Sequence, residues 1–205
     1  MAERLRSSVA TRLSRYLRVA RRAEKDGLAS ISSYEIAAYT GVNPTQVRRD
    51  LSAFGRFGKR GSGYRTDLLG ERLRSILGAD QTRAVVIVGA GRVGEALLGS
   101  QFADTQGLEV VAIFDIDPRK VGKTVGRLSV SPFSELELQV KRHGAQGGVI
   151  AVPERSAQEV ADRLVGAGVR ALVNYSEALL KVPSGVSVRT LDPAGELLSM
   201  LTQDV

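Results

Sequence analysis

Three glycines at G-x-G-x-x-G spacing carry the clearest chemistry in this chain. They follow the apolar stretch 84–88 directly, in the sequence AVVIVGAGRVG. In a strand–turn–helix unit the first glycine permits a tight turn, the second lets backbone approach a pyrophosphate, and the third lets the helix pack on the sheet. Amides at the helix start then bind the phosphates. The predicted phosphate-binding residues are those of the loop and first helical turn: Gly89, Ala90, Gly91, Arg92, Val93 and Gly94.

An acidic residue stands where such a site needs one. Asp115 follows Gly94 by 21 residues and comes directly after the apolar stretch 110–114. A carboxylate there accepts hydrogen bonds from the adenosine ribose hydroxyls and repels a 2′-phosphate, so it favours NAD over NADP. The cations Arg119 and Lys120 follow Asp115 closely in the sequence and suit a 2′-phosphate, so NADP remains the alternative nucleotide. We therefore expect an NAD(H) site.

The positive charge lies almost entirely upstream of this site. Residues 1–80 hold 16 Lys and Arg against 8 Asp and Glu, a net charge of +8, whereas the remainder holds 13 against 14, a net charge of −1. A basic segment beside a near-neutral one indicates a polyanionic partner, because neutralising phosphates releases counterions. A solvated basic surface that only keeps the chain soluble is the alternative.

Residues 1–80 also show the spacing of three helices. Gly27 ends the first, whose predicted buried face is apolar at three- and four-residue spacing: Val9, Leu13, Tyr16, Leu17 and Ala20. The second opens with the capping box Ser32-x-x-Glu35 and stops at the Gly41 turn. The third starts at Asn43-Pro44. Helix, tight turn and helix in this order predict a helix-turn-helix.

The third helix divides into two faces. Val47, Leu51 and Phe54 lie at i, i+4 and i+7, so we expect them to point into the core, with Asp50 near them in a structural contact. Polar and basic side chains on the opposite face and its flanks are the candidate base readers: Thr45, Gln46, Arg48, Arg49 and Ser52. Arginine in a major groove suits guanine. A solvent-facing polar helix in an all-α domain remains the alternative.

The glycine-rich segment 55–64 follows this helix. It combines four glycines with basic residues and two aromatics, Phe57 and Tyr64, which predicts a β-hairpin wing anchored to the core. Lys59 and Arg60 near its tip suit a minor groove or a phosphate. A flexible glycine loop is the alternative. A short linking helix over 67–77 then leads to a boundary near residue 80.

Beyond residue 82, apolar β-rich runs alternate with helical stretches. Runs at 85–88, 110–114, 148–152 and 171–173 predict an α/β Rossmann-type parallel sheet. The expected domains are a winged helix-turn-helix at 1–80, a dinucleotide-binding domain at 81–191 and a C-terminal helix at 192–205. Leu197, Leu198 and Leu201 give that helix an apolar face that suits a partner chain.

Several classes of function are disfavoured. The chain has no cysteine and one histidine, so we expect no metal site. That histidine, His143, ends a predicted helix, and too few residues follow the sheet for a substrate domain, so we expect no enzyme. An NAD-dependent dehydrogenase and a CoA-binding module are the rivals. No apolar run approaches about 20 residues, and no signal peptide is evident. We expect a cytoplasmic protein without a membrane segment.

The chain resembles the Rex family of bacterial redox-sensing transcriptional repressors. The likeness covers most of the sequence, from SRYLR at 14–18 and QVRRDLS at 46–52 through RGSGY at 60–64 and VGAGRVG at 88–94 to FDIDP at 114–118. The resemblance implies a homodimer with exchanged C-terminal helices on a palindromic duplex. It implies that NADH releases DNA and that NAD⁺ competes without release.

The resemblance also assigns residues and marks two departures. It adds Val152, Pro153 and Asn174 to the cofactor site, and Arg18 and Asp192 as an interdomain switch. Similar family members carry a tyrosine where Ser100 stands and a phenylalanine where Pro193 stands. Because the missing ring covers nicotinamide in the family, a Rex-like paralogue with a weak NADH response is the alternative. The operator, the regulated genes and activation versus repression stay open.

Overall fold

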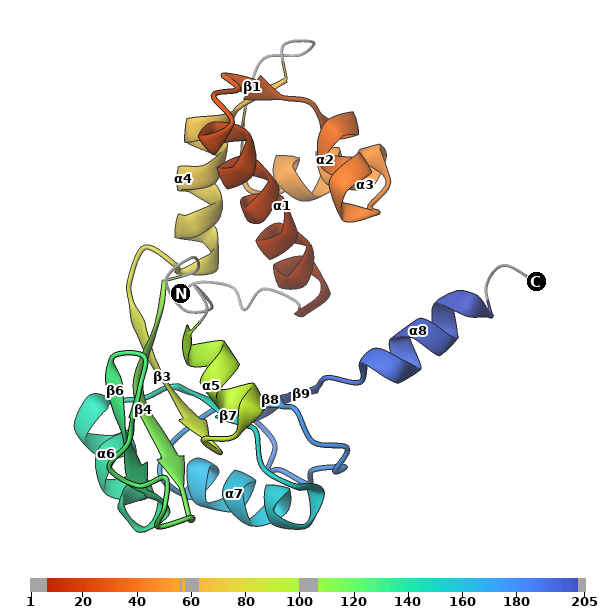
Figure 1. Ribbon diagram of the computed structural model, residues 1–205. Helices are drawn as coiled ribbons and strands as arrows, with labels where there is room; N and C mark the ends of the chain where they lie inside the picture. The colour runs from red at the N-terminus through yellow and green to blue at the C-terminus, as the bar shows by residue number, and fades with distance from the viewer. Residues whose placement is uncertain (1–6, 56, 58–62, 100–106, 203–205) are drawn as a thin grey trace. The chain divides into compact units, whose positions relative to one another are not determined.

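The computed structural model describes residues 7–55, 57, 63–99 and 107–202 (Figure 1). The chain folds into two compact units, Met1–Gln81 and Thr82–Val205. Each unit encloses apolar cores of its own. The predicted wing residues Lys59 and Arg60, together with Ser100, lie outside the described residues.

The N-terminal unit is a helical domain with a small sheet. Its elements are α1 (Ser7–Lys25), β1 (Ser30–Ile31), α2 (Ser33–Thr40), α3 (Pro44–Ser52), β2 (Tyr64–Arg65) and α4 (Thr66–Leu77). Within this unit α1 and α4 lie side by side (Figure 1). The predicted α1 face forms the core, where Leu13, Tyr16 and Leu17 cluster with α3 and α4 side chains.

Local capping interactions that the sequence predicts define the helix-turn-helix. The Ser32 side chain accepts from the Glu35 amide and the Glu35 carboxylate accepts from the Ser32 amide, which completes the capping box. Gly41 ends α2 with a φ of 67°, and the Asn43 side chain caps α3. The tight turn between α2 and α3 is therefore fixed at both ends by side-chain and glycine chemistry.

Two details of this unit bear on the sequence-based expectation. Phe54 is 36% exposed, so its predicted place in the core is wrong. The cause is that α3 ends at Ser52, which takes Phe54 out of the helical register. Phe57 is buried in the core of this unit and Tyr64 packs against that core, as expected of residues that anchor a wing. Strand β2 pairs antiparallel with β1, so the described end of the wing is tied to the segment before α2.

The C-terminal unit is a doubly wound α/β domain. Its elements are β3 (Arg83–Val88), α5 (Arg92–Gly99), β4 (Leu108–Asp115), β5 (Thr124–Val125), β6 (Leu128–Pro132), η1 (Phe133–Glu135), α6 (Leu136–His143), β7 (Gly147–Ile150), α7 (Glu154–Gly166), β8 (Ala171–Asn174), β9 (Ser187–Thr190) and α8 (Pro193–Leu201). The sheet runs β5-β6-β4-β3-β7-β8-β9, and only the β5–β6 pair is antiparallel among the described strands.

This topology confirms the predicted Rossmann-type fold. The parallel strands lie in the order β6-β4-β3-β7-β8-β9, which is that of the dinucleotide-binding fold. Strand order reverses between β3 and β7, where such folds bind ligands beyond the carboxyl ends of the strands. The loop that carries the glycine motif leaves β3 at this point.

Alternating side chains of β3 feed two cores. Val86 and Val88 pack with residues of α6 and α7 on one face of the sheet. Val85 and Ile87 pack on the other face, against Leu97 and neighbouring α5 residues. Because both faces are covered, the strand reads as a continuous apolar run, which is what the sequence shows.

Helix α8 differs from the other helices of this unit. None of its described residues is buried, and four large apolar side chains on it are exposed: Leu197, Leu198, Met200 and Leu201. A helix with an uncovered apolar face is poorly accounted for within one chain, because burial of such surface is what stabilises helices in proteins.

Candidate functional site

The three glycines of the motif are needed for different structural reasons. A Cβ on Gly89 would collide with the Ala151 carbonyl oxygen, and a Cβ on Gly94 would collide with the Gly89 carbonyl oxygen. Gly89 also has a φ of 106°, which disfavours other residues. A Cβ on Gly91 would meet no atom within 4 Å. Packing therefore requires the first and third glycines, whereas the second faces open space that a phosphate group fits.

Helix α5 starts directly at this loop. Its first helical hydrogen bond runs from the Glu95 amide to the Gly91 carbonyl at 2.9 Å. The amides of Arg92 and Val93 precede that bond, so they have no acceptor within the helix. Both residues are exposed. The helix start thus offers the backbone donors and partial positive charge that bind phosphate.

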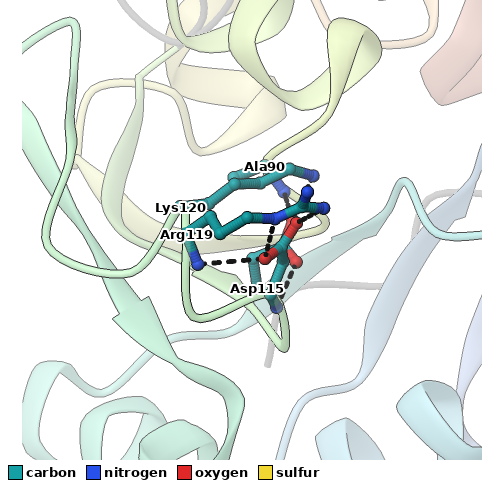
Figure 2. Close-up of polar contacts among 5 residues, drawn as sticks. Ala90, Asp115, Arg119 and Lys120 are labelled. Carbon is teal, nitrogen blue, oxygen red and sulfur yellow. Dashed lines mark hydrogen bonds and ion pairs between the residues drawn. The ribbon is translucent and has the colours of Figure 1, made fainter.

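Asp115 is the centre of a hydrogen-bond cluster beside the loop (Figure 2). Its Oδ2 accepts from the Ala90 amide at 2.9 Å and from Lys120 Nζ at 2.9 Å. Its Oδ1 accepts from the Asp117 amide at 2.9 Å. Burial alone would raise the pKa of Asp115, but these hydrogen bonds outweigh it and hold the pKa below its usual value. The carboxylate is therefore ionised at neutral pH.

These contacts change what Asp115 can do for a nucleotide. Each carboxylate oxygen accepts about two hydrogen bonds, so Oδ2 is filled and Oδ1 retains one position. The predicted contact with ribose hydroxyls is thus limited to one further hydrogen bond at Oδ1. The same side chain also fixes the glycine loop through the Ala90 amide, so that amide does not face the phosphates.

Arg119 and Lys120, the two cations that the sequence offers as ligands for a 2′-phosphate, are both paired with carboxylates. Arg119 forms hydrogen bonds with both Asp117 oxygens, at 3.0 and 2.8 Å, and Lys120 binds Asp115. The Arg119 side chain and amide lower the pKa of Asp117 to about 2. Each cation already has a carboxylate partner, which favours a ribose without a 2′-phosphate.

An open cavity of about 480 Å³ lies beside Asp115. Its lining comes from the last residues of β4 and β6, from the segments that follow them and from α7: Asp115, Ile116, Pro118, Val121, Pro132, Phe133, Ser134 and Arg163. Arg163 lies over the Phe133 ring at 4.0 Å and donates to both Glu137 oxygens at 2.6 and 2.7 Å. Much of the lining is apolar, and the cavity lies next to the carboxylate expected to bind a ribose, so it suits an adenine.

The other predicted cofactor residues lie in two environments. Val152 is half-buried next to Gly89, and Pro153 is exposed at the start of α7. Asn174 is fully buried, where its Oδ1 accepts from the Ser176 amide and hydroxyl and its Nδ2 donates to the Ala178 carbonyl. In this conformation the Asn174 side chain orders the loop after β8 and has no surface for a nucleotide.

The exposed face of α3 contains most of the predicted base readers. Thr45, Arg48, Arg49 and Ser52 are exposed, and Gln46 is half-buried. Arg48 donates to Ser33 Oγ and Thr45 Oγ1, both at 3.0 Å, and lies over the Tyr34 ring at 5.7 Å. Arg49 has no side-chain partner among the described residues, so it is free to reach a base.

A buried ion pair joins this helix to α1. The Asp50 carboxylate is 5% exposed and accepts from Arg12 Nε at 2.6 Å and Nη2 at 2.8 Å. It also accepts from the Tyr16 hydroxyl at 2.9 Å and from Gln46 Nε2 at 2.6 Å. The predicted structural role of Asp50 is confirmed, and the contacts hold α3 against α1.

The two predicted switch residues lie in different units. Arg18 is exposed on α1, where it lines an open groove of about 470 Å³ with Arg15, Arg22 and Tyr39. Asp192 caps α8, with its Oδ1 accepting from the Gly195 amide at 2.9 Å. A cap is a local role that an acidic residue at a helix start fills in any protein.

Two family models match parts of the chain. The model described as "Putative DNA-binding protein N-terminus" matches residues 7–52, which span α1 to α3. The model described as "CoA binding domain" matches residues 80–178, which span the sheet from β3 to β8. These assignments follow the two compact units.

Curated relatives match almost the whole chain. A "Redox-sensing transcriptional repressor Rex" from Rubrobacter xylanophilus is 41% identical over 201 residues, which cover 98% of this chain and 93% of the relative. One from Roseiflexus sp. is 41% identical and covers 94% and 87%. The chain belongs to the Rex family.

Solved Rex structures agree with this assignment. The Rex-family repressor RSP in complex with β-NADH matches with a TM-score of 0.85 and 32% identity, over 98% of this chain and 94% of that one. RSP in complex with β-NAD⁺ and operator DNA matches with a TM-score of 0.86 and 33% identity, over 98% and 93%. Sequence and fold thus give the same family assignment.

Some features of this Rex-family chain have no clear sequence signal. The Arg48 contacts with Ser33 and Tyr34 depend on how α2 packs on α3, and the Arg163–Phe133 wall joins residues 30 apart in the sequence. In the part of the chain that the structure describes, no group of three or more His, Cys, Asp and Glu could hold a metal ion. None of the described helices is both long and apolar enough to cross a membrane.

Proposed function

We propose that this chain is a DNA-binding repressor whose C-terminal unit binds NAD(H), and that the redox state of the nucleotide changes its affinity for double-stranded DNA. The observation that carries the proposal is the Asp115 cluster, which locks a phosphate-binding loop and leaves one acceptor for a ribose, in a chain that also carries an exposed arginine on a recognition helix. RSP, a relative over nearly the full chain, has been solved with both nucleotides and with operator DNA.

Residues in the C-terminal unit divide the work of nucleotide binding. The Gly91 backbone and the amides of Arg92 and Val93 hold the pyrophosphate, and Asp115 Oδ1 holds the adenosine ribose. The cavity bounded by Ile116 and Phe133 receives the adenine. When bound, the nicotinamide supplies a ring whose charge and planarity differ between its oxidised and reduced forms.

Residues in the N-terminal unit contact DNA in two ways. Arg49 reads a base edge, and Thr45, Gln46, Arg48 and Ser52 surround it on α3. Lys59 and Arg60 of the wing contact a minor groove or phosphates. The net charge of +8 on residues 1–80 supplies the salt-dependent, non-specific part of the affinity.

The proposed active form is a homodimer in the cytoplasm. The uncovered Leu197, Leu198 and Leu201 support exchange of α8 between subunits, because this apolar face has no cover among the described residues. A two-fold dimer fits a palindromic operator. Arg18 and Asp192 couple the two units in this proposal.

A weak NADH response is the second candidate, since Ser100 and Pro193 lack the aromatic rings found in similar members. An oxidoreductase is disfavoured by the repressor names of the relatives. Neither candidate changes the nucleotide-binding residues proposed above.

Calorimetric titration of the purified protein with NADH, NAD⁺ and NADPH tests the proposal. We expect NADH and NAD⁺ to bind and NADPH to bind at least about tenfold more weakly, a difference of 1.4 kcal/mol. Heat of binding for none of the three nucleotides would refute the assignment of the C-terminal unit. Tight NADPH binding would show that Arg119 or Lys120 leaves its aspartate for a phosphate.

A further inference from the structure

Arg48 on the recognition helix is held against the start of the helix before it. Its Nη1 donates to Ser33 Oγ and its Nη2 donates to Thr45 Oγ1, both at 3.0 Å. Ser33 is the first residue of α2 and is buried, whereas Thr45 lies in the first turn of α3. The guanidinium is therefore fixed where the starts of the two helices meet, and it is bound to both of them.

An exposed aromatic ring lies beside this guanidinium. The guanidinium carbon of Arg48 lies over the Tyr34 ring, 5.7 Å from its centre, which is within the range of a cation–π contact. Tyr34 is the second residue of α2 and is 68% exposed. Its hydroxyl forms no hydrogen bond with any residue that the structure describes, so it can donate one to a ligand.

The described end of the wing also lies near Arg48. Strand β2 pairs with β1, and this pairing places Tyr64 opposite Ile31, two residues before Ser33. Burial raises the pKa of the Tyr64 hydroxyl, and the positive charge of Arg48 partly offsets that rise, a Coulombic effect that weakens with distance. Arg48 thus lies where α2, α3 and the base of the wing come together.

This place in the fold faces the backbone of a bound duplex. In a helix-turn-helix complex the second helix lies in the major groove and the first helix crosses the backbone. The wing suits the neighbouring minor groove. Because the sugar–phosphate backbone separates the two grooves, a cation held between α2, α3 and the wing faces phosphates. The N–H groups of Arg48 that do not bind Ser33 or Thr45 have no acceptor in the described part of the chain, so they can bind a phosphate oxygen.

We infer that Arg48 and Tyr34 form a binding site for one phosphate of the DNA backbone, and that Arg48 positions the chain on the duplex and reads no base. Arginine and tyrosine both donate to phosphate oxygens in protein–DNA complexes. The carboxylate of the adjacent Glu35 accepts from the Ser32 amide at 2.7 Å, so the charge of Arg48 is left for a ligand. This inference rests on the proposed DNA binding and divides it between Arg48 and the base reader Arg49.

Replacement of single phosphates by neutral methylphosphonates is the first step of the test. The full-length chain is titrated by fluorescence anisotropy with a selected duplex in which each phosphate is replaced in turn. We expect one replacement in each half-site to weaken binding by wild type about tenfold but to leave binding by Arg48→Met unchanged. That variant keeps the length of the side chain and has already lost the cation that binds this phosphate.

Arg49→Met is the matched control, one residue along the same helix. Arg48→Met should weaken binding to the selected duplex and to a random duplex by the same factor. It should also lower the slope of log K against log salt concentration by about 0.9, the value for one phosphate. Its base preferences, selected from a randomised library, should equal those of wild type. Arg49→Met should instead lose the preference at one position of each half-site.

Tyr34→Phe tests the second member of the site. It removes one exposed hydroxyl and keeps the ring beside Arg48, so the fold should not change. We expect binding to both duplexes to weaken about threefold, the effect of one hydrogen bond. The same variant should equal wild type on the duplex that carries the methylphosphonate.

Each of the contrary results has a distinct meaning. Loss of a base preference in Arg48→Met would overturn the inference, because Arg48 would then read that base. A variant as sensitive as wild type to every methylphosphonate would overturn it too, and so would Tyr34→Phe binding all duplexes as wild type does. The Tyr34→Phe series holds even if Arg48→Met folds poorly. Failure of wild type to bind any duplex would instead refute the proposed DNA binding itself.

Discussion

Replacing Asp50 with alanine should destabilise the N-terminal unit by about 3 kcal/mol. Removing one partner of a buried ion pair costs about 3–5 kcal/mol, because the other charge is left without compensation. The Arg12 side chain is 25% exposed and can turn toward water, which moves the expected cost to the lower end. The fully buried Tyr16 hydroxyl also loses its acceptor, at a cost of about 1–3 kcal/mol that overlaps with the first.

Urea unfolding of the full chain followed by tyrosine fluorescence measures this effect. The chain has no tryptophan, and of its 5 tyrosines only Tyr175 lies outside the N-terminal unit. The signal therefore reports mainly on that unit, whose total stability is expected near about 5–15 kcal/mol. Asp67→Ala is the matched control, since it breaks an exposed aspartate–arginine pair in the same unit and should have a much smaller effect.

Acidification gives a second readout of the same ion pair. The pKa of Asp50 is lower in the folded chain than its unfolded value of about 3.9. Its contribution is therefore complete above that unfolded value and is lost as pH falls through the folded pKa. Wild type should lose stability in this acidic range more steeply than Asp50→Ala. Equal stability of Asp50→Ala and Asp67→Ala at pH 7, or parallel acid profiles, would refute the role given to the buried pair.

Three further outcomes are expected at the two sites. Arg49→Ala should weaken specific DNA binding by about 1–3 kcal/mol in anisotropy titrations and leave non-specific binding nearly unchanged, because it loses a base contact. Asp115→Ala should weaken NADH binding about tenfold or more by calorimetry, since the loop loses its acceptor for the Ala90 amide. Ser100→Tyr combined with Pro193→Phe should raise the ratio of NADH to NAD⁺ affinity above that of wild type.

Each of these outcomes has a control or a contradicting result. An equal loss on specific and random duplexes would assign Arg49 to phosphates instead of a base. Asp117→Ala removes the neighbouring carboxylate but keeps the amide that binds Asp115, so it should affect NADH binding less than Asp115→Ala does. An unchanged affinity ratio in the double variant would show that other side chains set the nicotinamide preference.

Local patterns were sufficient to predict much of the fold. The glycine spacing after β3 identified the phosphate loop because packing leaves no room for a Cβ at Gly89 and Gly94. The spacing of Asp50 from Val47 and Leu51 placed it toward the core, where it binds α1. Strands β5, β6 and β9 were not predicted, since they are short or carry polar residues at the edge of the sheet.

The details of the sites depended on tertiary contacts. Lys120 looked like a phosphate ligand in the sequence, yet it neutralises Asp115 because the turn after β4 brings the two together. The family resemblance assigned Asn174 to the cofactor site, yet its side-chain amide forms hydrogen bonds with the loop after β8. Gln46 looked like an ordinary base reader in the sequence, yet its side-chain amide donates to the buried Asp50 carboxylate. Such pairings follow from packing and cannot be read from spacing alone.

The most direct test of the central claim is the affinity for a selected duplex measured by fluorescence anisotropy with saturating NADH, with saturating NAD⁺ and without nucleotide. Coupling between the units predicts that NADH raises the Kd for DNA relative to NAD⁺. Because Ser100 and Pro193 lack the aromatic rings, the expected difference is within about tenfold, or 1.4 kcal/mol. The same Kd in all three conditions, with nucleotide binding verified by calorimetry, would contradict the account.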